Sequence, residues 1–226
     1  MRRQLVIHNV AQYTKIPRAA RTEAAKTTAA RQPWGAEEVR AFLLAIKDER
    51  LFAVMLLSLL GMRPAEVCGL RWPDVDLDAE EGQVENTRTL VDGEVVEKNT
   101  KSEKGTRALP LPAPVTAALK SFKAKQAAEK LALGEGYADT GYVLVDELGE
   151  PVRTDWLRRR AYDLMKLAGV RKVRLYDARH ACLTYLATNG VPDVIVSAWA
   201  GHADLSFTKR TSDLNAARDA LAGLLG

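Results

Sequence analysis

The sequence predicts a mainly α-helical domain of the α+β class, with one small antiparallel β-sheet near its middle. Most of the chain repeats apolar residues at helical spacing, which indicates helices packed on a core. Between about residues 82 and 112 the residues instead alternate on either side of an Asp92-Gly93 turn signal, as in a hairpin. A chain of 226 residues, 47% of them hydrophobic, is long and apolar enough to bury one core, so we expect one main domain.

The first helices of this domain are expected from residue 34 onward. The stretch "WGAEEVRAFLLAI" has acids at its start and apolar residues at helical spacing from Val39 to Ile46. The next stretch, "LFAVMLLSLLG", is nearly all apolar, so we expect a buried helix that ends at Gly61. Pro64 suits the first turn of a short third helix, "PAEVCGL".

The sheet is expected from three strands, "QVENTRTLV", "EVVEKN" and "RALPLP", of which the first two form the hairpin. Lys101 lies in the polar connection between the second and third strands. Helical patterns then resume, interrupted by a short "YVLV" hairpin. The predicted later helices are "APVTAALKSFKAKQAAEKLAL", "TDWLRRRAYDLMKLAG", "YDARHACLTYLATNG", "PDVIVSAWAG" and "LNAARDALAGLLG".

Charge is unevenly distributed along the chain. Residues 1–31 contain seven Arg and Lys residues and one acid, so this arm carries +6 of a net charge of +4 and the remainder carries about −2. A basic arm favours contact with a polyanion such as nucleic acid, although a solvated linker would have the same composition. No apolar run is long enough to cross a bilayer or to form a secretory signal, so we expect a cytoplasmic protein. Cys68 and Cys182 stand alone in apolar patterns, which predicts reduced core residues and no metal site. We expect no other cofactor.

Two arginines occupy positions suited to binding a phosphate or carboxylate. Arg63 follows a buried helix and its terminating glycine, where it could present its planar guanidinium group to an anion. The plainer alternative is an ion pair with Glu66 three residues later. In "LYDARHACLTYL", Arg179 shares one predicted helix face with Tyr176 and His180. The alternative there is a capping aspartate beside an interior histidine.

Lys101 and His202 are weaker signals when each is taken alone, but these motifs follow one another in a specific order. The arginine box "LLGMRPAEVCGLRWPDVDLD" is followed by "TKSEKGTRALPLP", then by "LYDARHACLTYLATNGVP" and "WAGHADLSFTKR". In this order, over roughly residues 32–210, the chain resembles the catalytic domain of the tyrosine recombinase family, the phage-integrase type. Its wording is most similar to that of actinobacterial and actinophage integrases.

The resemblance implies a role for each matching residue. Arg63 and Arg179 would clamp the scissile phosphate and stabilise the charge that develops in phosphoryl transfer. Lys101 would protonate the leaving 5′ hydroxyl, and His202 would donate a hydrogen bond to a phosphate oxygen. Glu66 would support the site from behind the residues that touch the phosphate.

The sequence departs from the family pattern at two catalytic positions. Tyr176 stands where the family usually has histidine, and a phenol is a poor proton acceptor at neutral pH. The nucleophilic tyrosine is expected nine or ten residues beyond His202, where this chain has Thr211 and Ser212. All six tyrosines precede His202, so the resemblance predicts a domain without its nucleophile.

The resemblance also predicts domain organisation and partners. We expect residues 1–31 to be the remnant of a core-binding domain and a basic linker, and residues 32–226 to be the catalytic domain. Double-stranded DNA is the expected partner. The chain is expected to be a monomer without DNA and could form a homo-tetramer on DNA, with the last helix packing in cis.

Three functions remain open from the sequence. The first is a DNA-binding, cleavage-defective member of the recombinase family. The second is an active recombinase that uses another residue or a tyrosine lent by a partner subunit. The third takes "LATNGVPDVIVSAWAGH" as a helix-turn-helix of a DNA-binding regulator.

Overall fold

The computed structural model describes residues 32–99, 107–201 and 211–225. The chain divides into two compact units, Met1–Gln32 and Pro33–Gly226. Of the first unit only Gln32 is described, so the architecture is that of the second.

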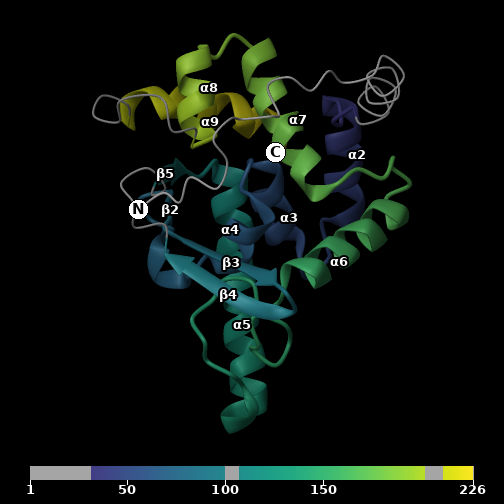
Figure 1. Cartoon of the computed structure of the whole chain (residues 1–226), viewed down its shortest axis with the longest axis vertical. Coiled ribbons are helices and arrows are strands. Elements are labelled where there is room, and N and C mark those ends of the chain that lie inside the picture. The colour runs from purple at the N-terminus through teal and green to yellow at the C-terminus, as the bar shows by residue number, and fades with distance from the viewer. Residues whose placement is uncertain (1–31, 100–106, 202–210, 226) are drawn as a thin grey trace, which may run out of the picture. The chain divides into compact units, whose positions relative to one another are not determined.

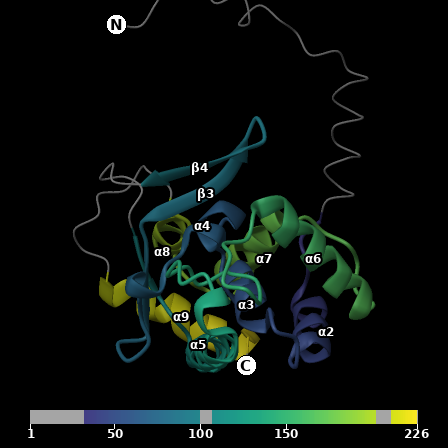
Figure 2. The ribbon, with the colours of Figure 1, turned by 90° about the horizontal axis from the view of Figure 1, so that it is seen from below.

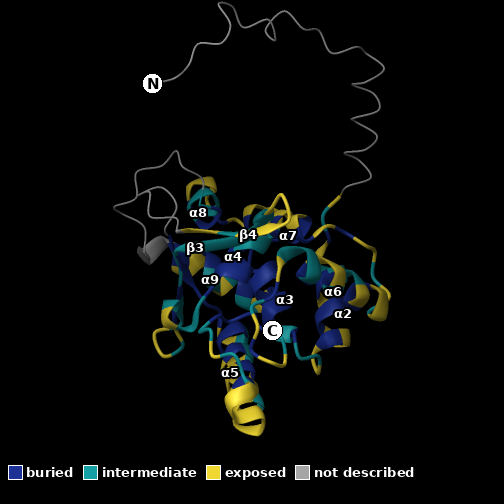
Figure 3. Cartoon of the chain, turned by 60° about the horizontal axis from the view of Figure 1, so that its bottom comes forward, coloured by how far each residue is buried: buried dark blue, intermediate teal, exposed yellow. Residues whose placement is uncertain are grey.

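A buried helix forms the centre of this unit. Helix α3 (Phe52–Leu59) is buried at every position after the first, as its apolar sequence predicts. It packs between α5 (Ala113–Leu133) and α7 (Leu175–Thr188), which lie on different sides of it (Figures 1 and 3). The preceding helix α2 (Ala36–Ile46) buries the apolar face predicted for it.

The C-terminal helix packs on its own domain. Helix α9 (Thr211–Leu225) buries Leu214, Ala217 and Leu221 against α2, α5, α7, α8 (Asp193–Trp199) and β5 (Arg107–Pro110). The helix therefore packs in cis, on elements of its own chain. On another side, α6 (Thr154–Leu167) covers α2 and α4 (Pro64–Gly69). In the part of the chain that the structure describes, no helix combines the length and the hydropathy that a membrane span requires.

The strands form two separate antiparallel sheets rather than one. Strands β1 (Val75–Asp76), β2 (Glu81–Val84) and β5 form a three-stranded sheet in the order β1-β2-β5. Strands β3 (Asn86–Val91) and β4 (Glu94–Asn99) form the predicted hairpin. Its two turn residues both have positive φ, 52° at Asp92 and 86° at Gly93, as expected for a tight two-residue hairpin turn. Short 3₁₀ turns span Trp72–Asp74 and Gly134–Gly136.

Two details of the predicted sheet were wrong. The stretch "QVENTRTLV" was predicted as one strand, but it divides at Glu85 into β2 and β3, and the third strand pairs with β2 instead of the hairpin. The physical reason lies at Gly69, because a Cβ atom there would come 2.7 Å from the backbone oxygen of Asn86. Helix α4 thus holds the start of β3 in direct backbone contact, away from the three-stranded sheet.

The second predicted hairpin, around "YVLV", is also reduced. Only isolated bridges form there, between Arg71 and Tyr142 and between Val145 and Pro151.

A polar cluster joins the β3–β4 hairpin to the irregular segment between α5 and α6, which contains Tyr142 and Pro151. The Tyr142 hydroxyl donates to Glu97 of β4 at 2.5 Å and accepts from Arg71 at 2.8 Å. Arg88 of β3 donates to the carbonyl oxygens of Pro151 and Val152. The β3–β4 hairpin therefore lies along one side of the domain, over α4 (Figure 2). The end of β4 leads directly into the segment that contains Lys101.

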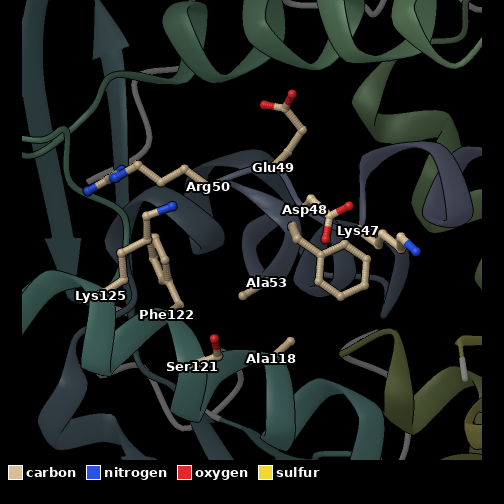
Figure 4. A pocket seen from close by; sticks show the side chains of 10 residues that line it. Lys47, Asp48, Glu49, Arg50, Ala53, Ala118, Ser121, Phe122 and Lys125 are labelled. Carbon is tan, nitrogen blue, oxygen red and sulfur yellow. The ribbon is translucent and has the colours of Figure 1, made fainter.

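A hollow of about 250 Å³ lies between the α2–α3 connection and α5 (Figure 4). Its arginine, Arg50, makes four hydrogen bonds to neighbouring parts of the domain. The guanidinium group donates to both carboxylate oxygens of Glu129 at 2.8 Å and to the carbonyl oxygens of Val145 and Asp146. This hollow shares no residue with the predicted site, and Arg50 joins α5 to the segment that contains Val145 and Asp146.

The contact at Gly69 gives a stability prediction. We expect Gly69→Ala to lower the free energy of unfolding by about 3 kcal/mol, because the added methyl group meets backbone that cannot rotate away. Gly136→Ala is the matched control, since nothing lies within 4 Å of a Cβ atom there. Urea denaturation of both variants measures the difference; equal stability would contradict the tight α4–β3 contact.

Candidate active site

Arg63 sits at the junction between two helices. Gly61, with a φ of 98°, ends the segment after α3 and lets the chain turn toward α4. Arg63 is the N-cap of α4, and its backbone N–H donates to Glu66 Oε2 at 2.8 Å. Its Nη1 donates to Glu66 Oε1 at 2.6 Å, and 35% of the side chain remains exposed. The ion pair weighed from sequence therefore exists, but it leaves the Arg63 side chain partly exposed.

Glu66 binds a second arginine that the sequence reasoning missed. Arg107, the first residue of β5, donates from Nη1 to Glu66 Oε1 at 3.0 Å and from Nη2 to Oε2 at 2.8 Å. Both side chains are almost completely buried, 3% and 4% exposed. Burial alone would raise the pKa of Glu66, but the hydrogen bonds and charge of Arg107 and the hydrogen bonds of Arg63 outweigh it and lower the pKa to about 2.

A strand signal was available for Arg107. In "RALPLP" alternate residues face the same side, so Arg107 shares a face with Leu109, which is in the core. An inward-facing arginine requires a buried partner. The sequence did not say which carboxylate supplies it, because Glu66 lies 41 residues earlier.

Arg179 lies deeper than predicted. It was expected on one face with Tyr176 and His180, but only 1% of it is exposed. Its Nη1 donates to the Gly61 carbonyl oxygen at 2.5 Å, and its Nη2 donates to the Ala200 carbonyl oxygen. Burial, together with the charges of Arg63 and Arg107, lowers the pKa of Arg179 to about 10, so it remains cationic at neutral pH.

Other donors meet the same helix end. The indole N–H of Trp199 donates to the Leu60 carbonyl oxygen at 2.8 Å, and Cys182 Sγ lies 3.4 Å from that oxygen. The carbonyl groups that α3 leaves unpaired at its C-terminus are thus satisfied from α7 and α8. Cys182 is free and buried, as predicted, and burial raises its pKa to about 12.

Tyr176 and His180 do share a face, on the exposed side of α7. Their rings lie edge to face with centroids 5.1 Å apart, and 43% of Tyr176 is exposed. Asp177 accepts from the backbone N–H of Arg174 at 3.0 Å, so the capping role weighed from sequence is present. The interior histidine weighed beside it is not, since His180 is exposed.

Lys101 and His202 lie outside the described residues, and so do the side chains of Thr211 and Ser212, whose backbone begins α9. The described ends of two of these segments meet. The chain resumes at Arg107 after the segment with Lys101, and Gly201 is the last described residue before His202. A Cβ atom on Gly201 would come 3.1 Å from Cδ of Arg107, so the two ends are in contact.

The assembled site has an excess of positive charge. The charges of Arg63, Arg107 and Glu66 all act on Arg179, and Glu66 is hydrogen-bonded to both Arg63 and Arg107. Three guanidinium groups and one carboxylate leave a net charge of +2, which favours an anion. Within the described part of the chain, no group of three His, Cys, Asp or Glu side chains could hold a metal ion.

Known proteins share this chain's sequence pattern. Residues 35–218 match the model of the phage integrase family. The chain belongs to that family. A "Tyrosine recombinase XerC-like" protein from Caldanaerobacter subterraneus subsp. tengcongensis is 31% identical over 185 residues, 76% of this chain and 47% of that protein. The ICEBs1 integrase of Bacillus subtilis is 25% identical over 77% of this chain and 48% of its own length.

Solved structures share the fold. The Tn1549 transposon integrase in complex with transposon right end DNA superposes with a TM-score of 0.63 at 19% identity, covering 85% of this chain and 66% of that one. The likeness confirms the predicted helical domain with small antiparallel sheets. The chain spans about half the length, or less, of the curated relatives it matches.

The low pKa of Glu66 gives a pH prediction. A carboxyl group whose pKa falls from 4.5 to about 2 on folding stabilises the protein above pH 4.5, and that stability is lost as the pH falls toward 2. We expect the free energy of unfolding to fall about 2 kcal/mol more between pH 6 and pH 3 in the parent chain than in Glu66→Gln. Urea titrations across this range measure it, with Glu37→Gln on the surface as the control. Equal slopes for the parent and Glu66→Gln would contradict the ion-paired carboxylate.

Proposed function

We propose that this chain is the catalytic-domain portion of a site-specific DNA recombinase that binds double-stranded DNA and holds a phosphate without cleaving it on its own. One observation carries the proposal: Arg63 and Arg179 of the two family boxes lie in one cluster with net charge +2. DNA phosphates are the anions that family members act on, and arginine forks match phosphate geometry. The DNA-bound Tn1549 integrase structure supports the same partner.

Each residue has a proposed part in this cradle. The exposed portion of Arg63 would donate directly to a phosphate oxygen. Arg179 would add a buried positive charge and, through the Gly61 and Ala200 carbonyl oxygens, would fix the two backbone segments that flank the phosphate. His202 would donate to a phosphate oxygen, and in a chain with its nucleophile restored Lys101 would protonate the leaving 5′ oxygen, as the family resemblance implies. Tyr176 would donate a hydrogen bond where relatives have a base.

The proposed lack of autonomous cleavage rests on the sequence after His202. Thr211 and Ser212 stand where the family places its nucleophilic tyrosine, and α9 begins at Thr211. A hydroxyl nucleophile needs an adjacent base for activation. We propose that the chain is a cytoplasmic monomer without DNA, because α9 covers its own domain, and that any tetramer forms on DNA.

DNA binding provides the first test. We expect Arg63→Met to weaken binding of a labelled duplex about tenfold at low salt and to reduce the salt dependence by about one phosphate contact. Arg40→Met is the matched control, because Arg40 is an exposed arginine of α2 paired with Glu37. Fluorescence anisotropy over a salt series measures both effects; identical losses in the two variants would contradict a phosphate site at Arg63.

Cleavage provides the second test, on nicked suicide duplexes with the sequence that flanks the gene. The unaltered chain is expected to form no covalent adduct. A version with Tyr-Val-His-Pro inserted between Thr211 and Ser212 is expected to form one, since it restores a phenol at the family spacing. A covalent adduct from the unaltered chain would contradict the proposal of a cleavage-defective domain, and mass mapping of that adduct would identify the nucleophile.

A further inference from the structure

We propose that Arg107 is a positioning residue that takes up the charge of Glu66, so that Arg63 remains a net cation toward the bound phosphate. The inference rests on the proposed phosphate site and adds a residue to it. Arg107 makes two hydrogen bonds to the carboxylate, whereas the side chain of Arg63 makes one. The carboxylate therefore divides its charge between a buried arginine and a partly exposed one.

If Arg63 were the only partner of Glu66, phosphate binding at Arg63 would be weakened. A single carboxylate at 2.6 Å would neutralise the guanidinium group that is to meet the phosphate, and the pair would carry no net charge. With Arg107 present, Arg63, Glu66 and Arg107 together carry +1. The exposed member of this trio is Arg63, so the excess charge is available on the open side.

Arg107 also lies where three segments of the site meet. Its guanidinium group binds Glu66 of α4, its backbone begins β5 after the segment with Lys101, and its side chain lies close to Gly201, which precedes His202. Gly201 has a φ of 63° and a Cβ atom there would come 3.2 Å from Nη1 of Arg107. One side chain thus fixes the distance from the arginine box to the described ends of both segments.

The test uses inorganic phosphate as the probe and the full chain as the protein. Phosphate affinity is taken from the rise in unfolding temperature with phosphate, with chloride at equal ionic strength as the reference. We expect Arg107→Met, which keeps the stem against Gly201, to weaken phosphate binding about tenfold, since Glu66 then neutralises Arg63. The phosphate affinity of Arg107→Lys should lie between those of the parent chain and Arg107→Met, because lysine keeps the charge but not the two parallel hydrogen bonds.

Rescue separates positioning from simple support of the fold. Removing both members of the buried pair in Arg107→Met/Glu66→Gln restores the charge on Arg63, so phosphate affinity should return to within about threefold of the parent chain. A folded double variant that binds as weakly as Arg107→Met would overturn the proposal, and so would an Arg107→Met variant with unchanged affinity. Should Arg107→Met fail to fold, Glu66→Gln alone decides, because weaker phosphate binding in that variant contradicts the proposal.

Two controls distinguish this inference from the proposed function. Arg159→Met removes a surface arginine paired with Asp155 and should leave phosphate affinity unchanged. Arg63→Met should abolish the phosphate response. If Arg63→Met binds phosphate like the parent chain, the phosphate site itself is wrong; if it fails to bind while Arg107→Met binds normally, only the role of Arg107 is wrong.

Discussion

The arrangement of the site depends on one shared carboxylate. Glu66 accepts from Arg63 beside it and from Arg107 on a strand 41 residues later. Breaking such a buried pair on one side leaves an uncompensated charge, which costs about 3–5 kcal/mol. Glu66 therefore stabilises the fold as well as setting the charge of the cluster. It joins the helical part of the domain to the three-stranded sheet.

The C-terminal end of α3 supplies the second fixed point. Its unpaired carbonyl groups attract donors from later helices, namely Trp199 to Leu60 and Arg179 to Gly61. Arg179 also donates to Ala200, so the end of α8 is held beside the end of α3. The buried positive charge of Arg179 is thus stabilised by backbone carbonyl oxygens rather than by a second carboxylate. The cluster keeps its net positive charge for this reason.

The sequence predicted local features well where their cause is local. Apolar spacing located α2, α3 and α9, a terminating glycine located the end of the α3 segment, and Asp92-Gly93 located the hairpin turn. The ordered motifs identified the family. The sequence did not predict the strand pairing, because a distant segment decides it. The close approach of Gly69 to Asn86 separates β3 from the three-stranded sheet.

The sequence by itself determined the helices, the hairpin and the family, and it proposed Arg63 and Arg179 as site residues, because helix periodicity, turn chemistry and motif order are properties of neighbouring residues. Only the tertiary structure decided that Arg107 lies beside the proposed site, that Arg179 is buried and that Glu66 joins two arginines. These facts depend on burial and on ion pairs between segments far apart in the chain. Sequence spacing carries no information on which carboxylate an inward-facing arginine will meet.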